Sequence, residues 1–343
     1  MPVPAGALRH DLRARIEAAL GSALVETDIP GHACTLRGKV RDNYDLPDGR
    51  RLIVATDRQS AFDKVLAAVP FKGQVLTAVA RFWFEATADL CRNHVLAYPD
   101  PNVTAARRLA MLPVEVVVRD YLAGTTATSI WPMYRDGGRE LYGIRFADGL
   151  RRNEKLPETI VTPTTKGDAG AHDAPIAAAD VVARGLLTAA QWDEVRTLAL
   201  ALFARGRDIA AGRGLILVDT KYEFGLDEAG RVTLADEIHT PDSSRWWLAA
   251  SYAERFARDE DPEALDKDFL RRWIAARCDP YAEPIPPIPP ATLVEFALRY
   301  VALFETITGQ HFEPPPPAPP ARERIREAVG RWLREEAAHP DEG

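Results

Sequence analysis

The stretch from Leu215 to Trp247 constrains the fold of this 343-residue chain more than any other. Two short apolar runs, residues 215–218 and 232–235, stand on either side of the turn sequence Asp-Glu-Ala-Gly. Turn residues that end in glycine suit a type I turn. The simplest structure for the segment is therefore a β-hairpin.

This predicted hairpin concentrates charge on one side. Side chains alternate along a strand, so three charged residues share a face: Asp219, Lys221 and Glu223. A register that pairs Leu226 with Arg231 puts Asp236 opposite Lys221 and on the same face. Such a face is either a solvated surface with cross-strand ion pairs or a site for magnesium and a phosphorylated substrate. The hairpin alone leaves both interpretations open.

Composition excludes several classes of protein. The hydrophobic fraction of 46% and the charged fraction of 27% are ordinary for a globular chain, and the length suits roughly two domains. A net charge of −7 argues against non-specific nucleic-acid binding. No apolar run approaches the roughly 20 residues that span a bilayer, and the charged N-terminal region is no signal peptide. Three widely spaced cysteines indicate a reducing cytoplasm, and the histidines show no zinc-binding spacing.

The order of expected elements predicts an α+β or mixed architecture. Strands are expected on both sides of the Pro47-Asp48-Gly49 turn and over 114–118. Helical spacing of apolar residues predicts helices over 8–20, 75–93, 189–211, 248–258, 266–276, 291–308 and 321–338. Two proline-rich segments, 283–290 and 314–320, are expected to be stiff extended connectors rather than partner-recognition motifs.

Two motifs in the first part of the chain suit an anionic ligand. In Arg37-Gly-Lys-Val-Arg-Asp42, Gly38 lets backbone amides approach phosphates, and Lys39 and Arg41 supply positive charge. The alternative is an exposed charged turn. In the polar loop after the next strand, Ser60 and Asp63 either contact a ligand or cap the following segment.

Later motifs add further ligand-binding candidates. Arg119 ends a β-branched run and suits bidentate recognition of a carboxylate or phosphate, or else pairs with Asp120. The loop 162–173, rich in hydroxyls, glycine and charge, is of the kind that closes over ligands. It contains His172 and Asp173, but no nucleophile-elbow serine accompanies them, which argues against a hydrolytic triad.

The segment Pro241-Asp-Ser-Ser-Arg245 follows the acidic end of the hairpin. Its hydroxyls and arginine suit a phosphate. Alternatively, Ser243 or Ser244 caps a helix through Trp247. Both can hold together, because a helix N-terminus favours anions.

The motifs in combination resemble one family. GKVRD, ATDRQSAFD, VEVVVRDYLAGT, TPTTKGDAGAHD, LILVDTKYEFG and LADEIHTPDSSRW occur in this order over about residues 30 to 310. Together they resemble the SAICAR synthetase (phosphoribosylaminoimidazole-succinocarboxamide synthase) family, in its longer, yeast-like form. The resemblance implies an ATP-dependent ligase of purine biosynthesis that joins L-aspartate to 5-amino-1-(5-phospho-D-ribosyl)imidazole-4-carboxylate. The products would be SAICAR, ADP and phosphate, formed by way of carboxylate phosphorylation.

The resemblance also implies an architecture and a setting. An α+β fold with antiparallel sheets in two subdomains would enclose an ATP cleft. The expected division is a nucleotide-binding part over 1–113, a substrate and metal part over 114–282, and proline-rich connectors with C-terminal helices over 283–343. The enzyme would act in the cytoplasm on small molecules, without nucleic acid or membrane, as a monomer or small homo-oligomer.

Each matching residue acquires an implied role. Lys39 and Arg41 would neutralise ATP phosphates at Gly38, and the strand through Val116 would offer backbone groups to the adenine. Glu223 and Asp236 would bind Mg²⁺, with Glu237 ordering the loop. Asp219 and Lys221, which with Lys39 form the implied catalytic set, would contact the imidazole carboxylate. The remaining implied substrate contacts are Ser60, Asp63, Arg119, Thr125, Lys166, His172, Asp173, Asp242, Ser244, Arg245 and Lys267.

Two other functions use some of the same residues. Another ATP-dependent small-molecule kinase or ligase would need the same carboxylates and phosphate-binding lysine, although no HRD catalytic loop of the protein-kinase type is present. A silent nucleotide-binding module would not need to keep metal ligands, so the presence of Lys39, Glu223 and Asp236 argues against it.

Overall fold

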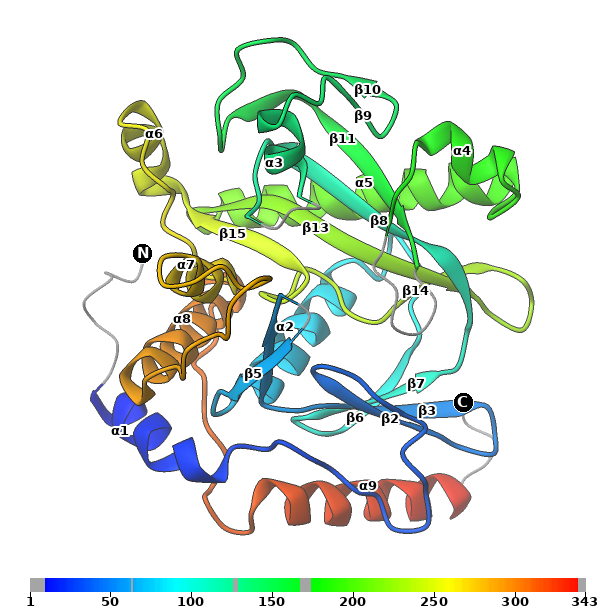
Figure 1. Ribbon diagram of the computed structural model, residues 1–343. Helices are drawn as coiled ribbons and strands as arrows, with labels where there is room; N and C mark the ends of the chain where they lie inside the picture. Colours follow the sequence, from blue (N-terminus) through cyan, green and yellow to red (C-terminus); the bar gives the residue numbers. More distant parts are fainter. Residues whose placement is uncertain (1–9, 63, 126–128, 167–173, 339–343) are drawn as a thin grey trace.

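Two antiparallel sheets form the body of the computed structural model, which describes residues 10–62, 64–125, 129–166 and 174–338. The smaller sheet has the strand order β1-β2-β3-β7-β6. Its strands are β1 (Leu36–Arg37), β2 (Arg41–Asp45), β3 (Arg50–Ala55), β6 (Val95–Asp100) and β7 (Val103–Arg107). Figure 1 shows it in the lower part of the molecule, below the larger sheet.

The larger sheet has the order β12-β11-β8-β13-β14, and β15 also pairs with β13. Its strands are β8 (Ala110–Tyr121), β11 (Lys155–Thr165), β12 (Ala174–Pro175), β13 (Leu215–Leu226), β14 (Val232–Ala235) and β15 (Ser244–Leu248). Two short hairpins, β4 (Arg58–Ala61) with β5 (Lys64–Ala68) and β9 (Glu140–Leu141) with β10 (Ile144–Arg145), lie outside both sheets. The antiparallel sheets and the interspersed helices confirm the α+β class.

The helices pack on the two sheets and on one another. They are α1 (His10–Ala19), α2 (Lys72–Ala86), α3 (Ile130–Arg135), α4 (Ala178–Ala183), α5 (Ala189–Ala211), α6 (Ala249–Ala257), α7 (Asp268–Ala275), α8 (Pro290–Thr308) and α9 (Ala321–Ala338), with a 3₁₀ turn over Leu20–Ser22. The main core joins α2, α5 and α8 to the larger sheet. On the smaller sheet, Ile325 and Val329 of α9 are buried in one cluster with Leu52 and Val54. None of the helices in the described residues is long and apolar enough to cross a membrane.

The structure corrects the predicted register of the hairpin by one residue. Leu226 pairs with Val232, not with Arg231, and β14 ends at Ala235. The Asp227 side chain accepts hydrogen bonds from the backbone N–H groups of Ala229 and Arg231, at 3.0 and 2.8 Å. This side-chain-capped turn holds one residue more than the prediction allowed.

Two further boundaries differ from the sequence prediction. Residues 244–248 form β15 against β13, not a helix capped by Ser243 or Ser244, and α6 begins only at Ala249. The helix expected over 75–93 is α2, which begins at Lys72 and ends at Ala86. Its end is set by Thr87, whose hydroxyl donates to the Trp83 carbonyl at 2.7 Å and whose own carbonyl accepts from Leu90.

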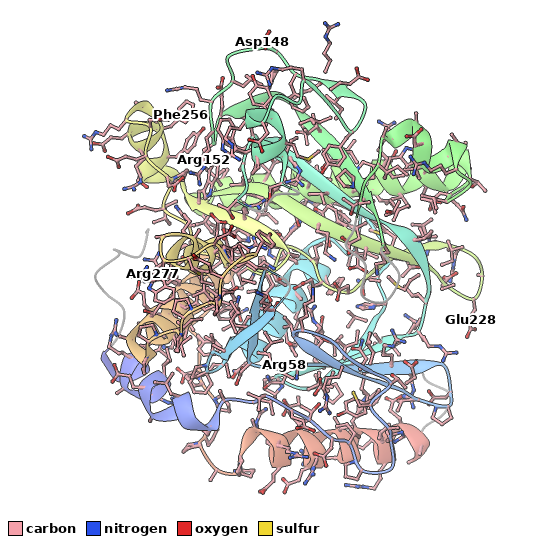
Figure 2. The ribbon with its side chains drawn as sticks, in the orientation of Figure 1. Arg58, Asp148, Arg152, Glu228, Phe256 and Arg277 are labelled. Atoms are coloured by element: carbon pink, nitrogen blue, oxygen red, sulfur yellow. The ribbon has the colours of Figure 1, made fainter. Side chains whose placement is uncertain are left out.

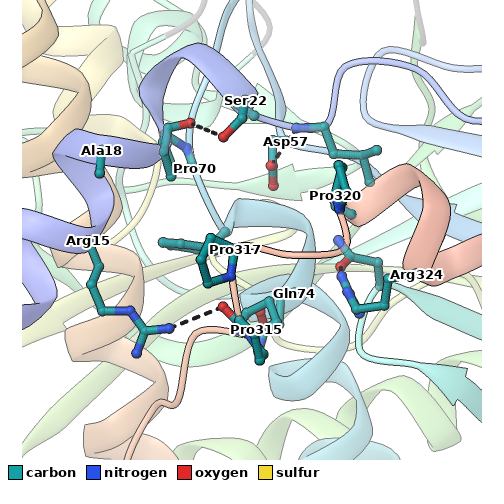
Figure 3. A pocket seen from close by; sticks show the side chains of 17 residues that line it. Arg15, Ala18, Ser22, Asp57, Pro70, Gln74, Pro315, Pro317, Pro320 and Arg324 are labelled. Atoms are coloured by element: carbon teal, nitrogen blue, oxygen red, sulfur yellow. Dashed lines mark hydrogen bonds between the residues drawn. The ribbon is translucent and has the colours of Figure 1, made fainter.

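The proline-rich segments connect elements, as expected. Pro290 is itself the first residue of α8, where a missing N–H costs nothing. The second segment runs from α8 to α9 and is held by Arg15 of α1, whose guanidinium donates to the Pro314 and Pro315 carbonyls at 2.7 and 3.1 Å. Pro315, Pro317 and Pro320 line a cavity of about 270 Å³ together with Asp57 and Arg324, as Figure 3 shows.

Candidate active site

A cavity of about 520 Å³ is lined by residues of both sheets. One part of its wall is apolar: Leu36, Val40, Ile53, Leu109 and Met111. The other part is strongly charged: Lys39, Arg41, Arg51, Arg107, Arg108, Lys166, Lys221, Glu223, Asp236 and Glu237. An apolar wall beside a row of cations suits a ligand with a flat apolar end and an anionic end.

The Gly38 turn that borders this cavity is tight and well supported. The Gly38 N–H donates to the Arg41 carbonyl at 2.8 Å, and a Cβ at Gly38 would lie 3.2 Å from that oxygen. From beneath, the buried Arg58, labelled in Figure 2, donates to the Gly38 carbonyl at 2.9 Å and to Asp42 at 2.7 Å. The turn is therefore a fixed edge of the cavity, although the Arg37 and Lys39 side chains on either side of Gly38 are exposed.

Lys221 is the centre of an ion network in the cavity floor. Its Nζ contacts Glu223, lies 3.1 Å from Glu115 Oε1, and lies 3.9 Å from Asp236 Oδ2. Lys166 contacts Glu223 from the other side. Burial lowers the pKa of Lys221, but the three carboxylates outweigh it and hold that pKa well above its ordinary value.

Asp236 reaches this network by an unusual backbone turn. It follows the last residue of β14 and has φ of +59°, in the left-handed region that non-glycine residues rarely occupy. Its Oδ1 lies 3.2 Å from Arg41 Nη1, and Arg41 also pairs with Glu237 at 2.6 Å. The strained backbone thus carries a carboxylate to the cavity, where strain of this kind is often found.

A second cavity, of about 280 Å³, shares Lys221 with the first. Glu115, Val117 and Arg119 line it from alternate positions of β8. Asp219 lies between two guanidinium groups, 2.7 Å from Arg119 Nη1 and 2.5 Å from Arg245 Nη1. Asp120, the alternative partner of Arg119 in the sequence prediction, bonds instead to Thr159 at 2.5 Å.

Two cations of the smaller cavity have no acidic partner. Lys267 and Arg271 line it and form no ion pair within the described part of the chain. Burial lowers the pKa of Lys267 to about 8, against the opposing effect of Asp242. The Nε groups of Arg245 and Arg271 are buried without a hydrogen-bond partner. Buried cations with unused donors suit an anionic ligand such as a phosphate.

The carboxylates of the larger cavity also fit a magnesium ion. Mg²⁺ is usually held by one or two carboxylates together with substrate phosphates and water, rather than by a cage of protein ligands. Glu223 and Asp236 supply two hard oxygen ligands beside the cationic wall. The described residues contain no cluster of three or more His, Cys, Asp or Glu placed to hold a metal.

Comparisons with known proteins agree on one family. The family model described as SAICAR synthetase matches residues 34–288. The phosphoribosylaminoimidazole-succinocarboxamide synthase of Legionella pneumophila (strain Paris) is 50% identical over 90% of this chain and 98% of its own length. The chain belongs to the SAICAR synthetase family.

Solved structures of the family share the fold. SAICAR synthase from Saccharomyces cerevisiae, complexed with SAICAR, is similar with a TM-score of 0.73 and 30% identity, over 85% of this chain and all of that one. A type-2 SAICAR synthetase in complex with ADP is similar with a TM-score of 0.62 and 26% identity, over 81% and 99% of the two chains. As a member of this family the chain is an ATP-dependent ligase of purine biosynthesis.

The structure brings most of the predicted residues of this SAICAR synthetase family member into the two cavities. Gly38, Lys39, Arg41, Lys166, Lys221, Glu223 and Asp236 line the larger one. Arg119, Asp219, Lys221, Asp242, Ser244, Arg245 and Lys267 line the smaller one. Residues that are distant in sequence thus form two chambers that meet at Lys221.

Three predicted residues lie elsewhere. Val116 lines neither cavity, because strand alternation points its side chain away from Glu115 and Val117 and into the main core. Its strand is also paired with β11 and β13 on its two edges. The neighbouring residues Leu109 and Met111 line the larger cavity instead. Ser60 lies in the β4–β5 hairpin, and Thr125 donates to Asp268 at 3.0 Å without lining either cavity. Asp63, His172 and Asp173 lie outside the described residues.

Sequence reasoning missed two cavity residues that simple spacing rules identify. Glu115 is two and four residues before Val117 and Arg119, so strand alternation puts all three on one face. Arg271 is four residues after Lys267, one turn along the start of α7. Both signals depend on knowing the secondary structure, which the motifs themselves did not supply.

Proposed function

We propose that this chain condenses L-aspartate with 5-amino-1-(5-phospho-D-ribosyl)imidazole-4-carboxylate, using ATP, to give SAICAR, ADP and phosphate. The observation that carries the proposal is the position of Lys221 in the wall of both cavities. A group transferred from a ligand in one cavity to a ligand in the other must pass this cation. The related structures complexed with SAICAR and with ADP support the same pair of ligands.

ATP fits the larger cavity. The apolar residues at Leu36, Ile53 and Met111 suit an adenine ring, and the cations from Lys39 to Lys221 suit the phosphates. Glu223 and Asp236 would hold Mg²⁺, which supplies positive charge to the phosphate oxygens. The Gly38 turn would let backbone amides approach the phosphates closely.

The imidazole nucleotide fits the smaller cavity. Lys267, Arg271 and Arg245 have donors available for its phosphate. Asp219 and Lys221 would lie at the end where the substrate carboxylate meets the nucleotide cavity. Asp242 cannot bind an anion and would instead accept hydrogen bonds from a hydroxyl or amino group of the ligand.

The chemistry needs an activated carboxylate, because a carboxylate at neutral pH is a poor electrophile. Transfer of the terminal phosphoryl group of ATP to a substrate carboxylate oxygen releases ADP. The aspartate amine then attacks the carbon of the phosphorylated carboxyl group, which forms the C–N bond and releases phosphate. Lys221, held protonated by three carboxylates, would neutralise the charges that meet here and would not act as a base.

The setting of the reaction is part of the proposal. Cys34, Cys91 and Cys278 are all free thiols, which supports a reducing compartment such as the cytoplasm. The division into parts over 1–113, 114–282 and 283–343 stays a prediction, and its first boundary falls inside β8. We also propose a monomer or small homo-oligomer.

An assay of ADP release tests the function. Purified protein should release ADP only when ATP, L-aspartate and the carboxylated imidazole nucleotide are all present. Release without aspartate would favour a small-molecule kinase. No release under any combination of these substrates would contradict both functions and leave a silent nucleotide-binding module.

A further inference from the structure

Asp242 is held from behind by two residues that line neither cavity. Lys72 Nζ lies 2.7 Å from Asp242 Oδ2, and the Tyr300 hydroxyl donates to Oδ1 at 2.6 Å. The Lys72 side chain is fully buried, and that of Asp242 is 7% exposed. Each carboxylate oxygen therefore has one buried partner, and the remaining lone pairs are available on the side of the smaller cavity that Asp242 lines.

Lys72 is itself fixed by a rigid helix start. It is the first residue of α2, directly after Phe71, which has a left-handed φ of +62°. The next residue, Gly73, donates its N–H to the buried Asp57 at 3.0 Å. A Cβ at Gly73 would lie 2.2 Å from the Ala55 carbonyl, so only glycine fits. The ammonium group thus comes from a backbone with little freedom to move.

Tyr300 comes from a different element, in the middle of α8. It is fully buried, and Lys72 Nζ lies 6.0 Å from the centre of its ring. Two helices that pack against each other therefore meet the same carboxylate. Asp242 lines the smaller cavity together with Lys267, which forms no ion pair within the described residues.

Burying an ammonium, a carboxylate and a phenol together is costly unless each is satisfied. An apolar core would join α2 to α8 as well, so stability alone does not account for this cluster. A fixed acceptor in the cavity wall does account for it. If Lys72 were absent, the buried carboxylate would take up a proton, which replaces one charged acceptor with a donor, or would turn toward Lys267, which moves the acceptor.

We propose that Lys72 and Tyr300 are positioning residues that hold the Asp242 carboxylate in the wall of the smaller cavity as a hydrogen-bond acceptor for the imidazole nucleotide. The proposal rests on the proposed function, because it takes the nucleotide as the ligand of this cavity. Neither residue touches the ligand; both act through Asp242.

The test compares Lys72→Met and Tyr300→Phe with the wild-type enzyme in the ADP-release assay. Lys72→Met should raise KM for the imidazole nucleotide about tenfold or more, with KM for ATP changed less than about twofold. Tyr300→Phe keeps the ring and removes one hydrogen bond, so a smaller rise, roughly threefold or more, is expected. If Lys72→Met does not fold, the KM of Tyr300→Phe for the imidazole nucleotide tests the proposal by itself.

A double-mutant cycle separates positioning from a structural role. In an Asp242→Asn background, Lys72→Met should cost little further in kcat/KM, because its partner is already altered. If the fold-losses in kcat/KM of the two single variants simply multiply in the double variant, the proposal is overturned. So would an unchanged KM for the imidazole nucleotide in both single variants.

Arg324→Met is the matched structural control. Arg324 pairs with the buried Asp100 and neither residue lines the two cavities, so this variant also removes a cation from a buried carboxylate. It should lose stability with every KM unchanged. If Lys72→Met behaves in the same way, its role is only structural. If the wild-type enzyme itself fails to require both substrates, the proposed function has failed instead.

Discussion

Lys221 shows how neighbouring charges determine what one residue can do. A lysine buried alone would tend to lose its proton and become a base. Here Glu223, Glu115 and Asp236 surround it and raise its pKa. It is therefore held in its charged form, and the contribution that we propose for it in catalysis is electrostatic.

Glu223 is the residue whose charge the proposed metal site most requires. Burial raises the pKa of Glu223, but Lys221 and Lys166 outweigh it and lower that pKa below its ordinary value. Glu223→Gln keeps the shape and removes the charge. We expect ADP release to fall by at least about 10²-fold, while the folded state is kept. The measurements are steady-state kinetics and the thermal midpoint.

Glu228→Gln is the matched control for that variant. Glu228 lies in the exposed turn of the same hairpin, as Figure 2 shows, and lines neither candidate cavity. Its substitution should leave turnover within about twofold of wild type. Normal turnover in Glu223→Gln would show that the metal assignment is wrong.

Arg271 tests the assignment of the smaller cavity. It lines the smaller cavity and its Nε is buried without a partner, so Arg271→Met removes a cation beside the proposed phosphate. We expect KM for the imidazole nucleotide to rise about tenfold or more, with little change in KM for ATP. Arg277→Met, near the end of the same helix and exposed, should change neither value. Equal effects of the two variants would place the phosphate elsewhere.

The predicted residues that line the two cavities have something in common. Lys39, Lys221, Arg245 and Lys267 stand within local motifs, so their types and spacing are visible in one stretch of sequence. Glu115 and Arg271 enter the cavities through strand alternation and a helical turn, which follow from the fold. Lys72 meets Asp242 across 170 positions of sequence, and no local pattern contains such a contact.

At the scale of elements, α5 was predicted with the bounds that it has, over 189–211. Thr188 and Gln191 form a capping box at its start, and a long run without breakers follows. The hairpin of β13 and β14 was predicted in kind but not in register. A register depends on how many residues the turn absorbs, and here the Asp227 side chain settled that number.

The packing of α5 on the larger sheet gives a prediction about Gly206. A Cβ there would lie 2.4 Å from His239 Cε1 and 2.9 Å from Leu217 Cδ2. His239 cannot retreat, because it is fully buried against the Trp83 ring and bonded to Tyr222. Gly206→Ala should therefore destabilise the protein by about 1–3 kcal/mol, even though alanine favours a helix by roughly 1 kcal/mol.

Urea unfolding measures this change, with an unchanged m-value expected. Gly212→Ala, at the end of the same helix, is the control. Its backbone is already right-handed, with φ of −63°, and the nearest atom to a new Cβ is the Ile209 carbonyl oxygen at 3.5 Å. That variant should be within about 0.5 kcal/mol of wild type. A Gly206→Ala protein of wild-type stability would mean that the helix and sheet are less tightly packed than we infer.

The whole molecule was harder to predict than its parts. The sequence indicated two sheets and terminal helices, but not that α9 would cover the smaller sheet. The helix is short of apolar residues, and only Ile325, Ala328 and Val329 are buried. Its position is set by contacts with residues near the start of the chain, such as the pairing of Arg326 with Asp28. Contacts of that separation carry no local signal.

Buried titratable groups also act on the stability of the whole molecule. Burial lowers the pKa of His239 to about 3 and that of His94 to about 4, from an ordinary 6.5. Burial raises the pKa of Asp57 and of Asp266 to about 6, from 3.8. The two histidines bind fewer protons in the folded protein than in the unfolded chain, and the two carboxyls bind more. Their effects on the pH dependence of stability therefore have opposite signs.

Removing one histidine should change how the free energy of unfolding depends on pH. As pH falls from about 6.5 toward 4, each histidine lowers the free energy of unfolding by up to about 1.4 kcal/mol per pH unit. The two carboxyls raise it between about 6 and 3.8, which opposes the effect of the histidines over that range. The His239→Gln variant lacks one of these histidines. Its free energy of unfolding, relative to wild type, should therefore rise by up to about 1.4 kcal/mol for each pH unit by which the pH falls, whatever the difference at neutral pH. Urea unfolding at a series of pH values measures the difference. A His239→Gln curve parallel to that of the wild-type protein would mean that His239 accepts a proton in the folded protein.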